Sequence, residues 1–473
     1  MSEQRTPQGR REFVLAKRIL NALPVVVLVS LLTFVLDHYG WLKSFETAAL
    51  DRFFILRERV PARDVVMVEI DDGDYQQLFH ETSPLDPETL GDIIEAVAKN
   101  QPKLIAVDID TSASVFKDMK ISAAWPPVIW ARGARPGGGE GRGDPVLSRL
   151  PADEDVFVPE KILGRVDQPT DLLTGIALMP VDSDSQIRHL QREYPVTNGG
   201  GATDSAVKVE SFHWAIVKKY CELARGDRRC EKLFPPRTET VGHGEDELIL
   251  NLAIDPYAFE TPIKVSRVLD EAGTGNVSGG SPVFLSLKDK IVLLGGKYKA
   301  SRDYYETPTG TKYGLDLTAI AVESELSGTG IRPAGHFTLI ILEVLAGLTL
   351  VVFNYIFPHG WKHLIALAAI PLVALFGSFI AFSSLALWAN FIPTLVATQI
   401  HVLYDKRAEA KQLEREVQDL RDRLKSYEQD AQDRPADESE SPHATPDEPG
   451  DDAPKERIEE KQLAAETEAP KAK

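Results

Sequence analysis

The chain has 473 residues and a formal net charge of −18, so it is long enough for one large domain, or two ordinary ones, besides membrane segments. The excess of acidic residues argues against a nucleic-acid partner, because neutralising phosphates requires clustered Lys and Arg side chains. No cofactor or metal motif is recognisable, and we expect neither a cofactor nor a bound metal.

A basic leader at residues 1–18 precedes an apolar run at residues 19–37. This run is close to the roughly 20 residues that a helix needs to cross a bilayer. Lys and Arg before a span favour retention in the cytoplasm, so we expect an internal amino terminus and an exported domain at residues 38–335. No A-x-A-like cleavage site is visible before Phe45, which indicates an uncleaved anchor.

The exported segment has the pattern of an α/β domain. Residues 45–60 look like an amphipathic helix that leaves the membrane. A valine-rich run at 65–70, a helix at 88–100 and a second apolar run at 104–110 predict a right-handed crossover and a mostly parallel central sheet. Further strands are expected at 127–130, 175–179, 249–252 and 291–294, with a double-glycine turn after the last of these and a helix at 211–224.

The two cysteines, Cys221 and Cys230, lie close together in the exported segment. Their spacing suits one disulfide that closes a small loop in an oxidising compartment. Neither has the CxxC spacing of a metal or redox site. The alternative is two unrelated thiols.

Several segments occur in a recognisable order: LDRFFILR, VVMVEIDD, LIAVDID, PVDSDSQIRHL, then DKIVLLGG with Asp303 and TPTG. With the small-residue helix and three apolar runs that follow, this order resembles the type-two CHASE domain, the cyclases/histidine kinases associated sensory extracellular domain. The resemblance covers roughly residues 45–404 and implies an extracytoplasmic sensor. The chain departs from the family pattern at 184–188 and at 314–319, and if those positions contact a ligand, its ligand differs.

Acidic residues follow the two clearest strands: Asp71 and Asp72 after the first, and Asp108 and Asp110 at the second. Ligands of open parallel sheets bind beyond the carboxyl ends of the strands, so this rim is the predicted ligand site. Paired carboxylates there could hold a divalent cation. The simpler and favoured alternative is that Asp71 or Asp72 caps a helix and Asp110 caps a turn.

Two further residues belong to this prediction. Asp303 joins the rim if its strand is parallel to the others, and Arg188 pairs with one of these acids or with an anionic ligand, a structural ion pair being the favoured role. No Ser/His/Asp set at recognisable spacing is present, so no catalytic residue is predicted.

Three apolar runs follow at 336–357, 361–382 and 385–404. Basic residues in the loop after the first and at the end of the last place both on the cytoplasmic side, so we expect four spans in a bacterial inner membrane with both termini cytoplasmic. Glu343 lies inside the second span, where an ionisable group is costly. A hydrogen bond with Asn390 is one prediction, and snorkelling to the interface is the other.

Beyond the last run, residues 405–430 carry apolar side chains at alternate spacings of four and three, which predicts a short coiled coil and a homodimer. Residues 431–473 are rich in acids and poor in large apolar residues, which predicts disorder.

Proteins that resemble this chain often carry a cyclase, kinase or phosphatase domain after the membrane bundle. Residues 405–473 are too few and too polar for such a domain, so we expect no enzyme. The predicted function is a sensor that binds a small ligand or an envelope partner and signals to a separate cytoplasmic partner. The alternative is an envelope scaffold or assembly protein without ligand-dependent signalling.

Overall fold

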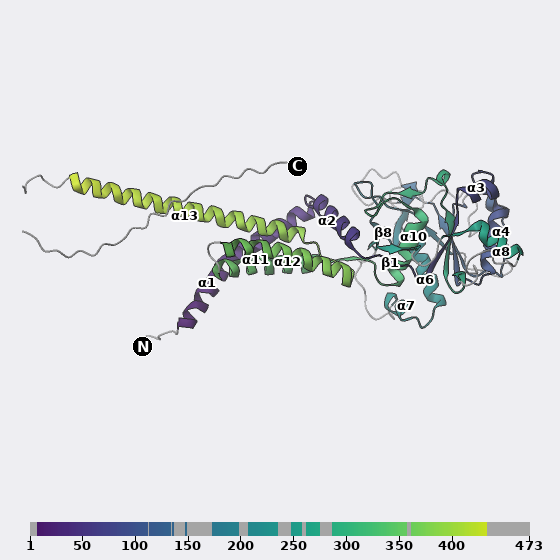
Figure 1. Cartoon of the computed structure of the whole chain (residues 1–473), viewed down its shortest axis with the longest axis horizontal. Helices are drawn as coiled ribbons and strands as arrows, with labels where there is room; N and C mark the ends of the chain where they lie inside the picture. The colour runs from purple at the N-terminus through teal and green to yellow at the C-terminus, as the bar shows by residue number, and fades with distance from the viewer. Residues whose placement is uncertain are drawn as a thin grey trace, which may run out of the picture. The chain divides into compact units, whose positions relative to one another are not determined.

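The computed structural model (Figure 1) describes residues 7–111, 113–133, 135–136, 147–148, 173–197, 207–234, 247–257, 262–274, 286–356 and 361–432. The chain divides into two compact units, Met1–Tyr404 and Asp405–Lys473. The first six residues of the predicted leader and residues 433–473 of the predicted tail lie outside the described residues.

Six parallel strands form the central sheet, in the order β13, β2, β14, β3, β4, β7. The central strand, β14 (Ile291–Gly296), pairs with β2 (Val65–Ile70) on one side and β3 (Leu104–Asp108) on the other. Near-continuous apolar runs suit strands that are buried on both faces. The predicted α/β class with a parallel sheet is therefore confirmed. The outer strands are β13 (Ile263–Lys264), β4 (Val128–Arg132) and β7 (Leu173–Ile176).

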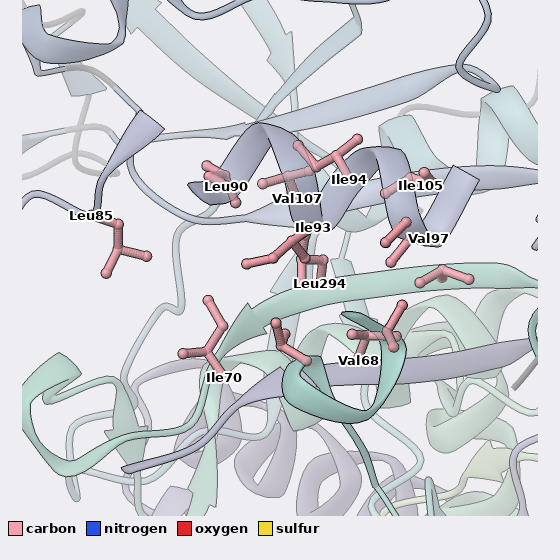
Figure 2. Packing of buried hydrophobic residues seen from close by; sticks show 14 of the residues in the cluster. Val68, Ile70, Leu85, Leu90, Ile93, Ile94, Val97, Ile105, Val107 and Leu294 are labelled. Carbon is pink, nitrogen blue, oxygen red and sulfur yellow. The ribbon is translucent and has the colours of Figure 1, made fainter. Parts of the chain in front are cut away.

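One face of the sheet is covered by α4 (Pro87–Ala98) and α8 (Val265–Thr274). Figure 2 shows Ile93 of α4 beside Val107 and Leu294 of the strands. These strand residues alternate with residues that face the opposite side, as successive side chains of a strand must.

The other face is covered by α6 (Phe212–Leu223) and α10 (Gly314–Leu326), which pack on alternate strand residues such as Met67, Ala106 and Leu293. All 13 residues of α10 are buried. One side of α10 packs on the sheet and another packs on the cluster that contains Phe53, so the helix is enclosed.

The helices α1 (Pro7–His38), α11 (His336–Ile356), α12 (Trp361–Leu385) and α13 (Ile392–Gln432) carry the apolar runs. Within the described residues, one helix is long and apolar enough to cross a membrane, and a second candidate is a pair of helices bent by 82° that ends with α2 (Lys43–Leu56). The apolar helices within α11 and α13 are shorter. The structure therefore supports one or two of the four predicted spans.

The last predicted span starts later than expected because residues 386–391 leave the helical path. There β18 (Leu387–Trp388) pairs in parallel with β17 (Arg332–Pro333), and the helix resumes at Ile392. The double glycine also differs from its prediction, since Gly295 and Gly296 belong to β14 rather than to a turn.

An aromatic cluster joins the sheet domain to the apolar helices. The ring of Phe53, on α2, lies with centroid distances of 5.2, 5.5, 5.4 and 5.9 Å from those of Phe379, Phe382, Trp388 and Phe391. The same buried cluster includes apolar residues of α10. The helix that leaves the first apolar run therefore shares one core with α10 and α12.

The remaining elements are short. They comprise the helices α3 (Asp72–Phe79), η1 (Ser114–Asp118), α7 (Arg228–Leu233) and η2 (Lys299–Ser301), and the strands β1 (Val60–Pro61), β5 (Arg135–Pro136), β6 (Leu147–Ser148), β8 (His189–Gln191), β9 (Glu193–Thr197), β10 (Val207–Glu210), β11 (Glu247–Ile249), β12 (Ile254–Asp255), β15 (Tyr304–Tyr305) and β16 (Lys312–Tyr313). The run predicted at 249–252 contributes only its first residue to β11, which pairs with β8 outside the central sheet.

Candidate functional site

At the carboxyl end of the sheet, three neighbouring strands place a row of residues beneath α10. Gly295 of β14 is in register with Glu69 of β2 and with Asp108 of β3. A Cβ on Gly295 would lie only 2.8 Å from Cδ1 of Leu315. The absence of a side chain at this position therefore lets the amino end of α10 pack directly onto the strand, between two carboxylates.

A polar cluster surrounds Lys297 on the Glu69 side of this row. Its Nζ lies 3.4 Å from Oε2 of Glu69 and 3.2 Å from Oδ1 of Asp316, and it donates a hydrogen bond to the Tyr257 hydroxyl. That hydroxyl in turn donates to Asp316. Burial raises the pKa of Glu69, although the charge of Lys297 opposes this shift. The Lys297 side chain is only 13% exposed, so one buried cation holds two acids and a phenol together.

Asp108 and Asp303 form an acidic pair on the other side of the row. Burial, together with the neighbouring Asp303 carboxylate, raises the pKa of Asp108 to about 7, although a hydrogen bond from Thr318 opposes the shift. Burial also raises the pKa of Asp303, whose carboxylate lies so close to Gly314 that a Cβ there would overlap it. Since two adjacent carboxylates resist double ionisation, the pair holds a proton up to near-neutral pH.

The Asp108→Asn variant should flatten the pH dependence of stability. The pKa of Asp108 is raised in the folded protein, above an unfolded value of about 3.9. Its stabilising contribution is therefore fully present below about pH 4 and is lost as the pH rises towards 7, by at most about 1.4 kcal/mol per pH unit. Unfolding midpoints measured across this range should show the slope in the wild type and in Asp110→Asn, an exposed position two residues later. Equal slopes in the wild type and in Asp108→Asn would contradict this assignment.

A cleft of about 410 Å³ opens beside the Lys297 cluster. Its walls come from the end of α2 and the residues after it, from β12, and from the loop between β15 and β16 that contains Pro308 and Thr309. Tyr257 and Asp316 belong to both the cleft and the cluster. The volume lies in the range of small-molecule pockets, and the mixture of apolar walls with a few polar groups is typical of them.

Arg188 is completely buried and joins α2 to the sheet domain. Its Nε and Nη2 donate to the two carboxylate oxygens of Asp51 at 2.7 and 2.9 Å, and its remaining donors reach Asp182 at 2.9 Å and Asp184 at 2.7 Å. Burial opposes the charge of Arg188, but the hydrogen bonds to three carboxylates outweigh it and raise the pKa. The sequence motifs LDRFFILR and PVDSDSQIRHL therefore meet at this residue.

A comparison with sequence families identifies the family of this chain. Residues 25–356 match the family model of the CHASE2 domain. The chain belongs to the CHASE2 domain family. No curated protein and no solved structure matches it. A CHASE2 domain is an extracytoplasmic sensory domain, so the protein is a sensor in signalling, and the resemblance predicted from the motifs is confirmed.

The acids predicted to form the rim of this CHASE2 domain do not converge, because β14 lies between the strands that carry them. Asp110 is exposed, and among the predicted ligand residues only Asp303 lies beside the central row. No group of three or more His, Cys, Asp or Glu side chains suited to a metal ion occurs within the part of the chain that the structure describes.

Asp71 and Asp72 have structural partners. Asp71 caps α3 by accepting a hydrogen bond from the amide of Asp74 at 2.8 Å, and it pairs with Lys264 at 2.6 Å. The hydrogen bond from Lys264 lowers the pKa of Asp71. Asp72 accepts a hydrogen bond from the amide of Lys299 at 2.8 Å. The capping alternative therefore describes Asp71 better than the ligand role does.

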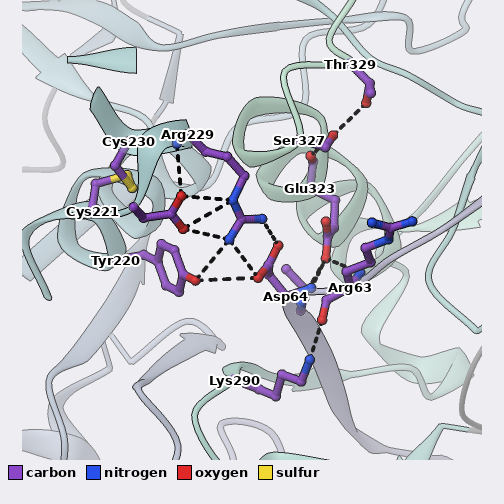
Figure 3. A network of polar contacts seen from close by, with 12 residues as sticks. Arg63, Asp64, Tyr220, Cys221, Arg229, Cys230, Lys290, Glu323, Ser327 and Thr329 are labelled. Carbon is purple, nitrogen blue, oxygen red and sulfur yellow. Dashed lines mark hydrogen bonds and ion pairs between the residues drawn. A yellow bond between two sulfur atoms is a disulfide. The ribbon is translucent and has the colours of Figure 1, made fainter. Parts of the chain in front are cut away.

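Cys221 of α6 and Cys230 of α7 are joined by a disulfide. Beside it, Arg229 bonds Asp64 at 2.6 Å and Asp227 at 2.8 Å (Figure 3). Because Asp64 immediately precedes β2, these bonds fasten α7 to the start of the sheet.

Glu323 of α10 contributes to the same network (Figure 3). Its Oε1 accepts hydrogen bonds from the amides of Arg63, Asp64 and Val65, at 2.6 Å for Arg63 and 2.9 Å for Val65. The carboxyl-terminal half of α10 is thus tied to the amino end of β2, and this network has a structural role.

Glu343 contacts the first apolar helix rather than the fourth run. Its Oε2 accepts a hydrogen bond from Oγ1 of Thr33 at 2.8 Å. Asn390 precedes α13, where its side-chain oxygen accepts from the amide of Ile392 at 3.1 Å. The structure therefore pairs Glu343 with Thr33 in place of the predicted Asn390, because the helix that would have carried Asn390 begins only after it.

Sequence reasoning missed Glu69, Lys297, Tyr257 and Asp316, which form the polar cluster beside the cleft. One signal was available, since Lys297 directly follows a glycine pair at the end of an apolar strand, where a buried cation needs partners. Tyr257 lies in a loop without a recognisable pattern, and only the folded chain brings it to Lys297.

Proposed function

We propose that the protein is a receptor that performs no catalysis, whose exported CHASE2 domain binds a small ligand or envelope partner and signals to a separate cytoplasmic partner. One observation carries this proposal. The end of α2 lines the cleft through Phe54 and Ile55, while the adjacent Phe53 lies in the aromatic cluster with α12. A ligand that favours one position of α2 would thereby shift the apolar helices, provided that it binds the two arrangements unequally.

We propose four spans, with both termini on the cytoplasmic side of a bacterial inner membrane. The hydrogen bond between Thr33 and Glu343 supports an association of α1 with α11. The close approach of Val26 to Gly347 supports it further, since small residues let helices pack closely in a membrane. Lys406 and Arg407 follow the apolar part of α13, as the positive-inside bias requires of a cytoplasmic end.

We propose that the signal passes to the cytoplasmic partner through a dimeric coiled coil. Along α13, five apolar residues at alternate spacings of four and three are exposed: Leu413, Val417, Leu420, Leu424 and Tyr427. Such a stripe matches the a and d positions of a coiled coil, so a second copy of the chain would cover it. About three heptads are marginal alone, and attachment to membrane helices would stabilise the pairing.

Leu420→Cys should form crosslinked dimers in membranes, and the crosslinked fraction should change when envelope extract is added. Arg421→Cys, one residue away and off the stripe, should crosslink far less under the same oxidant. Cys221 and Cys230 are bonded to each other and should not compete. Monomers under every condition would contradict the proposed receptor function. Dimers that never respond, together with a fixed set of co-purifying partners, would favour an envelope scaffold instead.

A further inference from the structure

The cleft is lined by two half-buried basic side chains, Arg57 and Lys312. Within the described residues, Nη1 of Arg57 is buried without a hydrogen-bond partner. Lys312 interacts electrostatically with Asp316 and Asp255, which line the same cleft. Arg57 follows the last residue of α2, and its Nη1 is buried. Lys312 is half-buried in β16, and burial lowers its pKa. Burial of a cation is costly unless hydrogen-bond acceptors compensate it, so a negative group that contacts both side chains would stabilise them.

The acids of the same cleft are already engaged. Asp255 lies 3.7 Å from Arg59, and Asp316 is held by Lys297 and Tyr257. The guanidinium of Arg57 lies 5.3 Å from the centroid of the Phe382 ring, which stabilises the charge on one side only. Both carboxylates of the cleft therefore already have partners.

The remaining lining is largely apolar. Leu252 and Ile254 are 3% exposed in the structure, and Phe54 and Pro308 complete this side of the cleft. A volume of about 410 Å³ accommodates a small molecule or a lipid head group but not a whole phospholipid.

We propose that this cleft binds a small amphiphilic anion, in which a phosphate or carboxylate contacts Arg57 and Lys312 while a short apolar part lies against Phe54, Leu252 and Ile254. The proposal rests on the proposed receptor function, because it assigns the chemical class of that receptor's ligand. A guanidinium offers two parallel donors to a phosphate or carboxylate, and an ammonium adds a point charge. The same chemistry occurs in soluble compounds and in the head groups of anionic phospholipids.

The test uses the full chain in nanodiscs of phosphatidylcholine, with butyl phosphate as the soluble probe and butanol as its neutral counterpart. Butyl phosphate should raise the unfolding midpoint, and butanol at the same concentration should not. Arg57→Gln and Lys312→Gln should each weaken the apparent affinity about tenfold or more, because each removes a charge-assisted contact. Lys299→Gln, a largely exposed cation outside the cleft, should bind like the wild type.

A second arm distinguishes the two sources. Nanodiscs that contain phosphatidylglycerol, without butyl phosphate, should raise the midpoint only if a head group enters the cleft, and Arg57→Gln should then abolish the rise. A response to butyl phosphate alone assigns a soluble ligand. The proposal is overturned if neither anion produces a shift that depends on Arg57 and Lys312, or if butanol acts equally well.

Two outcomes distinguish a wrong ligand class from a wrong receptor function. If butyl phosphate binds but the crosslinking of Leu420→Cys never changes with any addition, the ligand class stands and the receptor does not. If envelope extract still changes the crosslinking when both Arg57 and Lys312 are replaced by Gln, the receptor stands and this ligand class is wrong.

Discussion

Arg188→Ala should destabilise the exported domain by about 3–5 kcal/mol, because removing one partner of a buried ion pair leaves uncompensated charge. Three carboxylates, those of Asp51, Asp182 and Asp184, would remain around the space that the guanidinium now fills. Since Asp51 is on α2 and the other two acids belong to the sheet domain, the loss should also loosen α2. The measurement is the unfolding midpoint of the full chain.

Two variants serve as controls for this prediction. Arg188→Lys keeps a positive charge but cannot donate to both oxygens of Asp51, so an intermediate loss is expected. Lys219→Ala removes a cation that pairs with Glu222 at the surface of α6, and it should cost less than about 1 kcal/mol. A midpoint for Arg188→Ala equal to that of Lys219→Ala would show that the buried cluster contributes no stability.

Phe53→Ala should cost about 3–5 kcal/mol and should separate ligand binding from movement of the apolar helices. Phe53 is 3% exposed and touches four aromatic rings. Its removal leaves a cavity between α2 and α12, so a displacement of α2 would reach α12 only through the contacts of Phe54 and Arg57 with Phe382. The readouts are the unfolding midpoint and the response of the Leu420→Cys crosslink to ligand.

Phe45→Ala is the matched control, because Phe45 lies on the same helix and is 64% exposed. It should leave both the midpoint and the response nearly unchanged. Phe53→Leu fills much of the space and should retain most of the stability. If Phe53→Ala lost stability but kept the full crosslinking response, the aromatic cluster would hold the helices together without transmitting the signal.

The strands of the sheet could be predicted because their local composition leaves few alternatives. The runs at 65–70, 104–108 and 291–294 are apolar except for Glu69 and Asp108 near their carboxyl ends, as suits strands buried on both faces. Their order could not be predicted, because pairing depends on contacts between segments far apart in the chain. Of the strands in the central sheet, β14 comes last in sequence but lies between β2 and β3, so the acids of those two strands lie on either side of it.

The candidate site was predicted only in part for the same reason. Asp303 was found through its place after a strand, and Arg188 through a motif, but Lys297 was not recognised because its partners come from β2, a loop and α10. The cleft depends on the end of α2, which the sequence presents only as an amphipathic helix. A site assembled from such distant segments carries no local spacing that sequence reasoning could detect.

Crosslinking of Leu420→Cys in membranes tests most directly whether occupancy of the cleft moves the apolar helices. The crosslinked fraction should change on adding butyl phosphate or anionic lipid in an otherwise unaltered chain. It should change much less when Phe53→Ala is added, and it should stay constant when Arg57→Gln and Lys312→Gln are added together. An unchanged fraction in the unaltered chain with ligand bound, or the same change in all three chains, would contradict the account.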